Sequence, residues 1–222
     1  MKKQIIKKLL HKLPSSIQYI IEKSFINVKN KDTILKWKEN GGIPPPPSVY
    51  KQRIVQNYQK ISRYNVFIET GTYLGEMIDA QKGYFKKIIS IELGEDLWLR
   101  ATIKFKEYKH ISIKLGDSGK ILHRVMEEVT EPAIFWLDGH YSEGITAKGE
   151  LECPIIEELG AIFCTSKLNH IILIDDARYF KGENDYPTIE QLVQYVYSKN
   201  PTYNLSVEDD IIRLLPDSTL KN

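Results

Sequence analysis

The feature that most constrains the fold of this chain is a regular alternation, from about residue 65 onward, of short apolar runs with amphipathic segments. The apolar runs are rich in Ile, Val and Phe, as strands buried on both faces are, and the segments between them repeat apolar residues at helical spacing. The pattern predicts strands at residues 65–69, 87–92, 110–115, 132–138 and 170–175. It predicts helices at residues 76–85, 95–107, 118–129, 152–165 and 187–199. Such alternation is typical of a mostly parallel sheet that is covered by helices on both faces.

Two further strands are predicted near the end of the chain. Residues 203–207 and 211–215 flank Glu208-Asp209-Asp210, a short polar turn that suits an antiparallel hairpin. The predicted fold class is therefore α/β: a doubly wound, seven-stranded, Rossmann-like sheet whose last strand is antiparallel, preceded by an N-terminal helical extension.

The N-terminal extension is separated from the sheet-forming part by residues that interrupt helices. Gly41-Gly42 and the run Pro44–Pro47 form a stiff connector, so we expect a domain boundary there. Residues 1–47 are predicted to be a basic helical extension. Residues 48–222 are predicted to be the main domain, and its first helix is expected at 48–62.

Charge is distributed unevenly along the chain. Residues 1–60 carry 13 Lys and Arg side chains against three Asp and Glu, a net charge of +10. The remaining residues carry 18 against 26, a net charge of −8. Because an acidic domain repels phosphates, this charge argues against nucleic-acid binding by the main domain.

The start of the chain is predicted to be a basic amphipathic helix. Apolar residues recur at helical spacing and would form one face of this helix, with lysines between them in the sequence. These apolar residues are Ile5, Ile6, Leu9, Leu10 and Leu13. A second helix is expected after Pro14. Two interpretations stay open for these helices: they pack on the main domain, which we favour, or residues 1–28 make peripheral contact with a membrane surface.

Cysteine content and hydropathy indicate the compartment. Only Cys153 and Cys164 are present, which is too few for a disulfide framework. No stretch approaches the ~18 uninterrupted apolar residues of a membrane span. We therefore expect a cytoplasmic protein, with peripheral membrane contact as the alternative.

The predicted strands end in acidic and small residues. Ligands of doubly wound sheets bind outside the carboxyl ends of the strands, so these residues belong to one candidate site. They are Glu69-Thr-Gly71-Thr-Tyr-Leu-Gly75, Glu92, Gly116-Asp117-Ser118, Asp138-Gly139-His140 and Asp175-Asp176.

The first of these loops indicates a nucleoside ligand without a pyrophosphate. Gly71 and Gly75 allow a tight turn and a close approach to a ligand. The dinucleotide fingerprint G-x-G-x-x-G is not met, because Tyr73 stands at its second glycine. Glu69 would repel a phosphate but could accept a hydrogen bond from a cationic amino-acid group, while Glu92 is placed to bind two ribose hydroxyls. A nicotinamide-dependent dehydrogenase is correspondingly disfavoured.

With these residues, the chain from about Val66 to the terminal hairpin resembles the class I S-adenosylmethionine-dependent methyltransferases. V-F-I-E-T-G-T-Y-L-G is similar to their first motif, S-I-E-L to the second and G-D-S to the third. The family often has glycine where Tyr73 and Leu74 stand here. The resemblance implies S-adenosylmethionine as cofactor, with Glu69 near the methionine amine, Glu92 on the ribose and Asp117 near the adenine amine. The cofactor-binding residues it implies are Glu69, Thr70, Gly71, Thr72, Gly75, Glu92, Asp117, Ser118 and Asp138.

A second group of acidic residues suggests a metal ion. Asp138, Asp175 and Asp176 follow two strands that are adjacent in this fold, and carboxylate oxygens suit Mg²⁺ or another divalent cation. These positions resemble the metal ligands of metal-dependent small-molecule O-methyltransferases. In such enzymes a proton acceptor follows the first Asp closely, and His140 occupies that place. The predicted catalytic residues are His140 and Asp138, and the predicted metal ligands are the three aspartates.

The expected function is methyl transfer from S-adenosylmethionine to the oxygen of a small polar acceptor, such as a sugar or glycoside. A divalent ion would lower the pKa of the acceptor hydroxyl, and a histidine can take its proton near neutral pH. Two alternatives stay open: a catalytically silent nucleoside-binding module docked by its basic N-terminus, and a metal-dependent hydrolase. The aspartates could also be ordinary helix caps or solvated strand ends.

Overall fold

The computed structural model describes residues 15–139, 151–165 and 167–217. The chain divides into two units, residues 1–50 and residues 51–222. The predicted helix over residues 1–13 lies outside the described residues. No helix in the described ranges is long and apolar enough to cross a membrane.

The main element in the described part of the first unit, residues 15–50, is a long helix. The helix predicted after Pro14 is present as α2 (Ser15–Glu39), and it ends in a turn at Gly41 and Gly42, both with left-handed backbone φ angles of +85° and +63°. The indole Nε1 of Trp37 donates to the carbonyl oxygen of Ile43 at 2.8 Å, which fixes the turn against the end of the helix.

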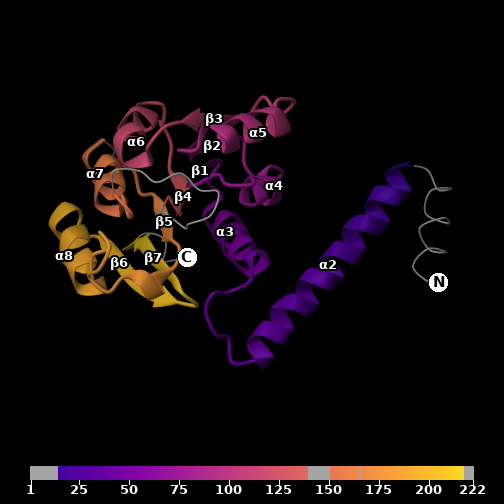
Figure 1. Ribbon diagram of the computed structural model, residues 1–222, viewed down its shortest axis with the longest axis horizontal. Coiled ribbons are helices and arrows are strands. Elements are labelled where there is room, and N and C mark those ends of the chain that lie inside the picture. The colour runs from indigo at the N-terminus through magenta and orange to yellow at the C-terminus, as the bar shows by residue number, and fades with distance from the viewer. Residues whose placement is uncertain (1–14, 140–150, 166, 218–222) are drawn as a thin grey trace. The chain divides into compact units, whose positions relative to one another are not determined.

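The second unit is built on a seven-stranded sheet (Figure 1). Its strands are β1 (Val66–Thr70), β2 (Lys87–Glu92), β3 (Ile111–Leu115), β4 (Ala133–Leu137), β5 (Ile171–Ile174), β6 (Tyr203–Glu208) and β7 (Ile211–Pro216). Their order is β3-β2-β1-β4-β5-β7-β6, with β7 antiparallel to both of its neighbours and the first five strands parallel. The predicted fold class and the antiparallel last strand are therefore confirmed.

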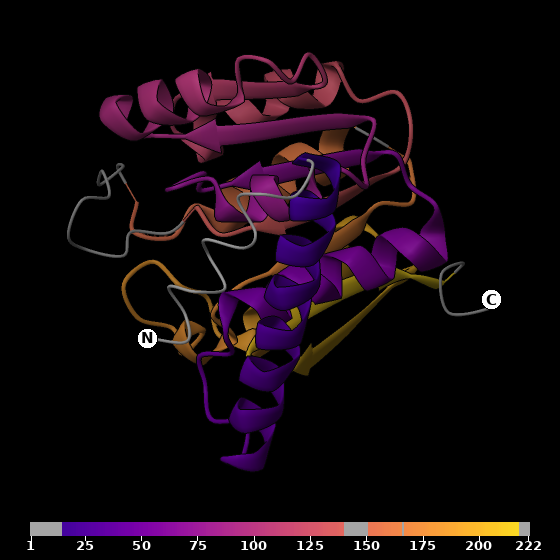
Figure 2. The same ribbon diagram turned by 90° about the vertical axis from the view of Figure 1, so that its right-hand side faces the viewer.

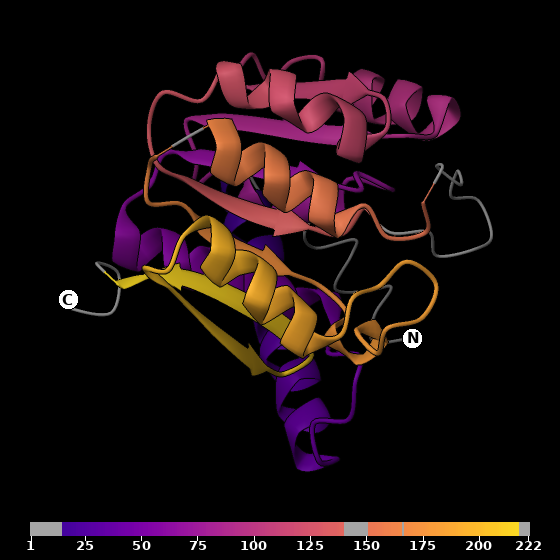
Figure 3. The same ribbon diagram turned by 90° about the vertical axis from the view of Figure 1, so that its left-hand side faces the viewer.

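Helices cover both faces of this sheet. One apolar core lies between the sheet and α6 (Ser118–Glu127), α7 (Ile155–Thr165) and α8 (Ile189–Lys199), which Figure 3 shows side by side in front of the strands. The other core joins the opposite face to α3 (Ser48–Ser62), α4 (Glu76–Gln81) and α5 (Glu95–Phe105), and Figure 2 shows α3 and α4 on that side. The two cores form because successive strand residues point to opposite faces of a sheet.

Two local differences from the predicted elements have clear causes. The helix expected at 76–85 ends at Gln81, since Gly83 lies in a turn closed by the amide of Tyr84 and the carbonyl oxygen of Gln81, 2.8 Å apart. A short 3₁₀ helix, η1 (Ala177–Tyr179), follows β5 and was not predicted.

The strand register places the carboxyl ends of the central strands at one edge. Thr70, the last residue of β1, is paired with Ile91 of β2 and with Leu137 of β4. Leu137 is in turn paired with Ile174 of β5. The residues that follow these strands therefore start from the same level of the sheet, which is where ligands of doubly wound sheets bind.

Candidate functional site

The loop after β1 passes very close to the end of β4. Gly71 has a φ of +80°, and a Cβ atom built on it would lie 2.2 Å from the carbonyl oxygen of Asp138. The amide of Gly71 donates to the carbonyl oxygen of Ile91 at 2.9 Å, so the loop is also tied to β2. Only glycine fits this approach, and the turn glycine predicted from the sequence is thereby explained.

The residue Tyr73 adopts the left-handed conformation that glycine adopts freely. Its φ is +48°, and Gly75 follows with a φ of +70° as the residue before α4. The loop thus has the backbone shape of a glycine-rich turn although a tyrosine stands at its centre. Strain of this kind persists only where surrounding contacts hold the backbone in place.

Glu92 supplies such a contact at the end of β2. One oxygen of its buried carboxylate accepts a hydrogen bond from the amide of Tyr73 and the other accepts one from the amide of Gly94, both at 2.8 Å. Each carboxylate oxygen has a further lone pair, so two ribose hydroxyls could still donate to this side chain. Glu92 therefore fixes two loops of the site and remains able to bind a ligand.

Glu69 lies beneath this loop in a fully enclosed position. Its carboxyl accepts a hydrogen bond from the hydroxyl of Ser90 at 2.6 Å, and Ser90 is linked to the hydroxyl of Thr72 at 2.6 Å. Burial raises the pKa of Glu69 to about 8, and the charges of Asp138 and Glu92 act in the same direction. A cationic amine placed nearby would favour the ionised carboxylate, as expected for the methionine amine of the predicted cofactor.

The predicted residues after β3 and β4 join the same edge. Asp117 caps α6 by accepting a hydrogen bond from the amide of Gly119 at 3.0 Å. Ser118 lies close to Gly139: a Cβ atom built on Gly139 would be 2.8 Å from the hydroxyl oxygen of Ser118. The hydroxyl of Thr70 accepts a hydrogen bond from the amide of Asp138 at 3.2 Å. The structure therefore brings the predicted cofactor-binding residues together at the carboxyl ends of β1 to β4.

The aspartate pair after β5 binds a lysine that the sequence analysis did not single out. The ammonium nitrogen of Lys51, on α3, lies 2.5 Å from Oδ2 of Asp175 and 3.3 Å from Oδ1 of Asp176. Burial acts to lower the pKa of Lys51, but the charges of Asp175 and Asp176 outweigh it and the pKa is raised. The lysine is therefore a cation.

A second cation reaches the same pair from η1. Nη1 of Arg178 donates to Oδ1 of Asp176 at 2.7 Å, and it also forms an ion pair with Asp210 of the β6–β7 turn. The backbone amide of Arg178 donates to Oδ1 of Asp210 at 2.8 Å. Asp209 and Asp210 have φ angles of +52° and +63°, so the tight turn predicted from the sequence also presents a carboxylate to the site.

The side chains of this region do not fit the predicted metal site. Within the described ranges, no three His, Cys, Asp or Glu side chains are arranged to hold a metal ion. Asp175 and Asp176 instead bind Lys51 and Arg178. His140, the predicted base, lies outside the described residues. We therefore derive no step through a metal ion, and metal binding stays a prediction.

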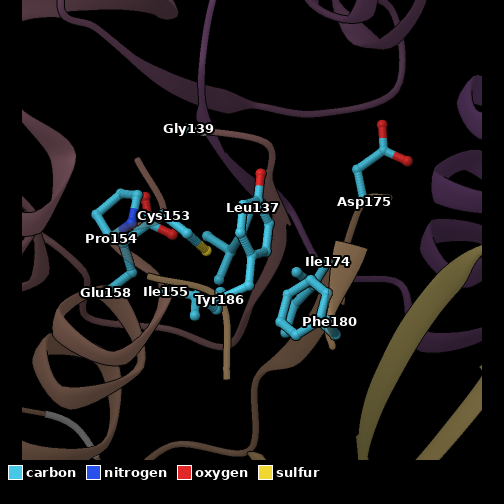
Figure 4. Close-up of a pocket in the computed structure, with 10 residues that line it drawn as sticks. All are labelled: Leu137, Gly139, Cys153, Pro154, Ile155, Glu158, Ile174, Asp175, Phe180 and Tyr186. Carbon is cyan, nitrogen blue, oxygen red and sulfur yellow. The ribbon is translucent and has the colours of Figure 1, made fainter. Parts of the chain in front are cut away.

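A small pocket opens beside Asp138 on the α7 side of the sheet (Figure 4). Apolar side chains of β4, β5 and the following segments line it together with polar groups. The lining residues are Leu137, Gly139, Cys153, Pro154, Ile155, Glu158, Ile174, Asp175, Phe180 and Tyr186. In the close-up the carboxylate of Asp175 points away from the other side chains, as expected from its ion pair with Lys51. The pocket is a candidate place for part of a small acceptor.

The sequence offered one signal for the missed lysine. Lys51 and Val55 are four residues apart on α3, so they lie on the same face of the helix, and Val55 is fully buried. A lysine on the buried face of a helix must find an anionic partner or reach solvent. That partner could not be identified, because Asp175 is 124 residues away in the chain.

Comparison with known proteins gives similarity in structure only. No protein-family model and no curated protein sequence matches the chain. An O-methyltransferase from Bacillus cereus, in complex with SAH, has a TM-score of 0.56 at 11% identity, covering 84% of this chain and 90% of that one. The SAH-bound methyltransferase PaMTH1 from Podospora anserina has a TM-score of 0.53 at 12% identity, covering 97% and 95%. The O-methyltransferase TomG from Streptomyces achromogenes, in complex with SAM, has a TM-score of 0.52 at 14% identity, covering 84% and 89%. At these identities the comparisons establish a shared fold.

Proposed function

We propose that this protein is an S-adenosylmethionine-dependent methyltransferase that methylates an oxygen of a small polar acceptor, such as a sugar or glycoside. The observation that supports it most is the arrangement around Glu92. This carboxylate holds the loops after β1 and β2 in place while it keeps lone pairs for a ribose. The solved structures with the same fold include O-methyltransferases bound to SAH and SAM, which agrees with this assignment.

The residues of the described site suit the parts of this cofactor. Glu92 would accept the ribose hydroxyls, Asp117 the adenine amine and Glu69 the ammonium of the methionine part. Gly71 allows the loop after β1 to pack directly against the backbone oxygen of Asp138. S-adenosylmethionine held by these residues would supply a methyl group to the acceptor oxygen, and its sulfur would keep the electron pair of the broken carbon–sulfur bond. The acceptor's proton must pass to a base, for which the sequence predicts His140.

The pocket beside Asp138 supports a small acceptor. It lies at the end of β4, next to Gly139 and Ser118, and combines apolar walls with Glu158 and Tyr186. Its small volume suits a single polar group of an acceptor, such as a hydroxyl. The peripheral membrane contact through residues 1–28, and the cytoplasmic location, remain predictions from the sequence.

Calorimetric titration with S-adenosylhomocysteine tests the cofactor assignment. We expect the wild-type protein to bind it and Glu92→Ala to weaken binding by about 1.5 to 3 kcal/mol, since charge-assisted hydrogen bonds are lost. Asp96→Ala removes an exposed carboxylate from the first turn of α5 and should leave the affinity unchanged. Wild-type protein that does not bind, or a folded Glu92→Ala variant with unchanged affinity, would contradict the proposal.

A further inference from the structure

Two of the three predicted metal ligands, Asp175 and Asp176, lie together beside Lys51. Asp138 follows β4, and Asp175 and Asp176 follow β5, which is paired with β4. Asp175 and Asp176 are both buried, with 3% and 8% of their surface exposed. Buried carboxylates need a nearby cation if they are to stay ionised together.

Lys51 is held firmly at this position. It lies on the same face of α3 as the fully buried Val55, and its side chain is only 16% exposed. Two hydrogen bonds tie neighbouring parts of α3 to α4: Gln56 Nε2 donates to the carbonyl oxygen of Ala80 at 3.1 Å, and Gln81 Nε2 donates to that of Gln52 at 3.0 Å. The ammonium is therefore placed by the fold and is not a freely moving surface charge.

The ammonium bridges two of the three predicted metal ligands. It lies 2.5 Å from an oxygen of Asp175 and 3.3 Å from an oxygen of Asp176. A divalent ion would need these same oxygens at about 2.0 to 2.6 Å. Such an ion could bind only after Lys51 had moved away, because both cations require the same space and the same lone pairs.

We propose that Lys51 is the built-in cation of this site and takes the place of a divalent metal ion. The role of this site in methyl transfer rests on the proposed function. The inference that Lys51 prevents a metal ion from binding does not depend on it. Among the described residues, the ammonium donates to two carboxylates, and an ammonium has three N–H groups. The third can hold the oxygen of the acceptor, so the lysine would orient that oxygen as a metal would.

Titration of the full-length protein with Mn²⁺, followed by calorimetry and electron paramagnetic resonance, tests this inference. We expect the wild-type protein to bind no Mn²⁺ at the aspartate site. Lys51→Gln removes the charge but keeps the length of the side chain, and we expect its affinity for Mn²⁺ to rise at least about tenfold above that of the wild type. Lys51→Arg keeps a cation and should remain without bound metal. Lys60→Gln, the same change on an exposed residue of the same helix, is the matched control.

Two results would overturn the inference. One is wild-type binding of Mn²⁺ that disappears in Asp176→Asn, which would show that the metal displaces Lys51. The other is a folded Lys51→Gln variant whose Mn²⁺ affinity equals that of the wild type, which would show that the carboxylates do not form a shared cation site. Binding of S-adenosylhomocysteine is measured on the same samples. Its absence in the wild type would count against the proposed function and leave the metal result standing.

Loss of Lys51 leaves buried carboxylates without their cation, so Lys51→Gln could unfold. In that case thermal unfolding is measured with and without Mn²⁺. A ligand that binds only the native state raises the melting temperature, so Mn²⁺ should stabilise Lys51→Gln and leave the wild type unchanged. The inference would be overturned if Mn²⁺ raised the melting temperatures of both proteins equally and if Asp176→Asn abolished this rise.

Discussion

Two buried titratable residues make the stability of this protein depend on pH in opposite directions. Burial lowers the pKa of His170 to about 4 from 6.5, and its Nδ1 accepts a hydrogen bond from the amide of Ala133 at 3.1 Å. As pH falls from 6.5 toward 4, the unfolded state binds a proton at His170 that the native state does not bind. The free energy of unfolding therefore decreases on acidification. For Glu69, whose pKa is raised from 4.5 to about 8, the native state keeps a proton that the unfolded state releases, so stability is lost as pH rises.

The contribution of Glu69 can be isolated between pH 6.5 and 8 by comparing the wild type with Glu69→Gln, because the titration of His170 affects both proteins equally. In this window the free energy of unfolding of the wild type should fall relative to that of Glu69→Gln, by up to about 1.4 kcal/mol per pH unit. Urea unfolding at several pH values measures the difference. A constant difference across the window would mean that Glu69 is ionised in the native protein throughout.

For individual residues, the sequence identified the acidic side chains of the site but not the groups that they bind. Glu69, Glu92 and Asp117 stood out because charged residues directly after buried strands need a reason. The amide of Tyr73, which Glu92 binds, carries no signal in the sequence, since every residue has such a group. The cation that the aspartates bind could not be chosen from among 31 Lys and Arg residues, although Lys51 shares a helix face with the apolar Val55.

Among the elements, the loop between β1 and α4 depends most on one residue. Gly71→Ala would place a Cβ atom 2.2 Å from the backbone oxygen of Asp138, at a φ of +80° that alanine rarely adopts. We expect it to destabilise the protein by about 2 to 4 kcal/mol and to weaken cofactor binding, because either the loop or the end of β4 must move.

Gly83→Ala is the matched control for this loop. Gly83 lies in the turn after α4, and a Cβ atom built on it meets nothing within 4 Å. Its melting temperature and its affinity for S-adenosylhomocysteine should stay close to those of the wild type. If Gly71→Ala behaved like Gly83→Ala in both measurements, the close approach of the loop to β4 would not be needed for the site.

The helices and strands themselves were predicted well, and their ends less so. Hydrophobic periodicity located each strand of the sheet to within one or two residues, because a strand buried on both faces leaves an uninterrupted apolar run. The 3₁₀ helix at Ala177–Tyr179 left no such pattern. It makes hydrogen bonds with Asp210 of the β6–β7 turn, which accepts from the amides of Ala177 and Arg178, so no local pattern in the sequence could reveal it.

For the whole molecule, the division into two units suggests that the first is dispensable for cofactor binding. All of the predicted cofactor-binding residues lie at or beyond Glu69, within residues 51–222. A protein that begins at Ser48 should bind S-adenosylhomocysteine with an affinity within about 0.5 kcal/mol of the full-length value, measured by calorimetry. A shortened protein that keeps a cooperative thermal transition but loses affinity would show that the N-terminal unit completes the site.

The sequence by itself determined the architecture: the alternation of apolar runs with segments of helical period predicts a doubly wound sheet, and the glycines of the first loop and the acidic strand ends predict a nucleoside site at one edge. These signals are local, because each depends on residues within a few turns or one strand. Only the tertiary structure decided which cation meets the aspartates. Lys51 and Asp175 are 124 residues apart in the chain, and they are brought together because α3 packs on the sheet with Val55 buried and the lysine aligned with the end of β5. Whether Asp175 and Asp176 bind a metal ion or an ammonium depends on this packing, which the spacing of residues in the sequence does not encode.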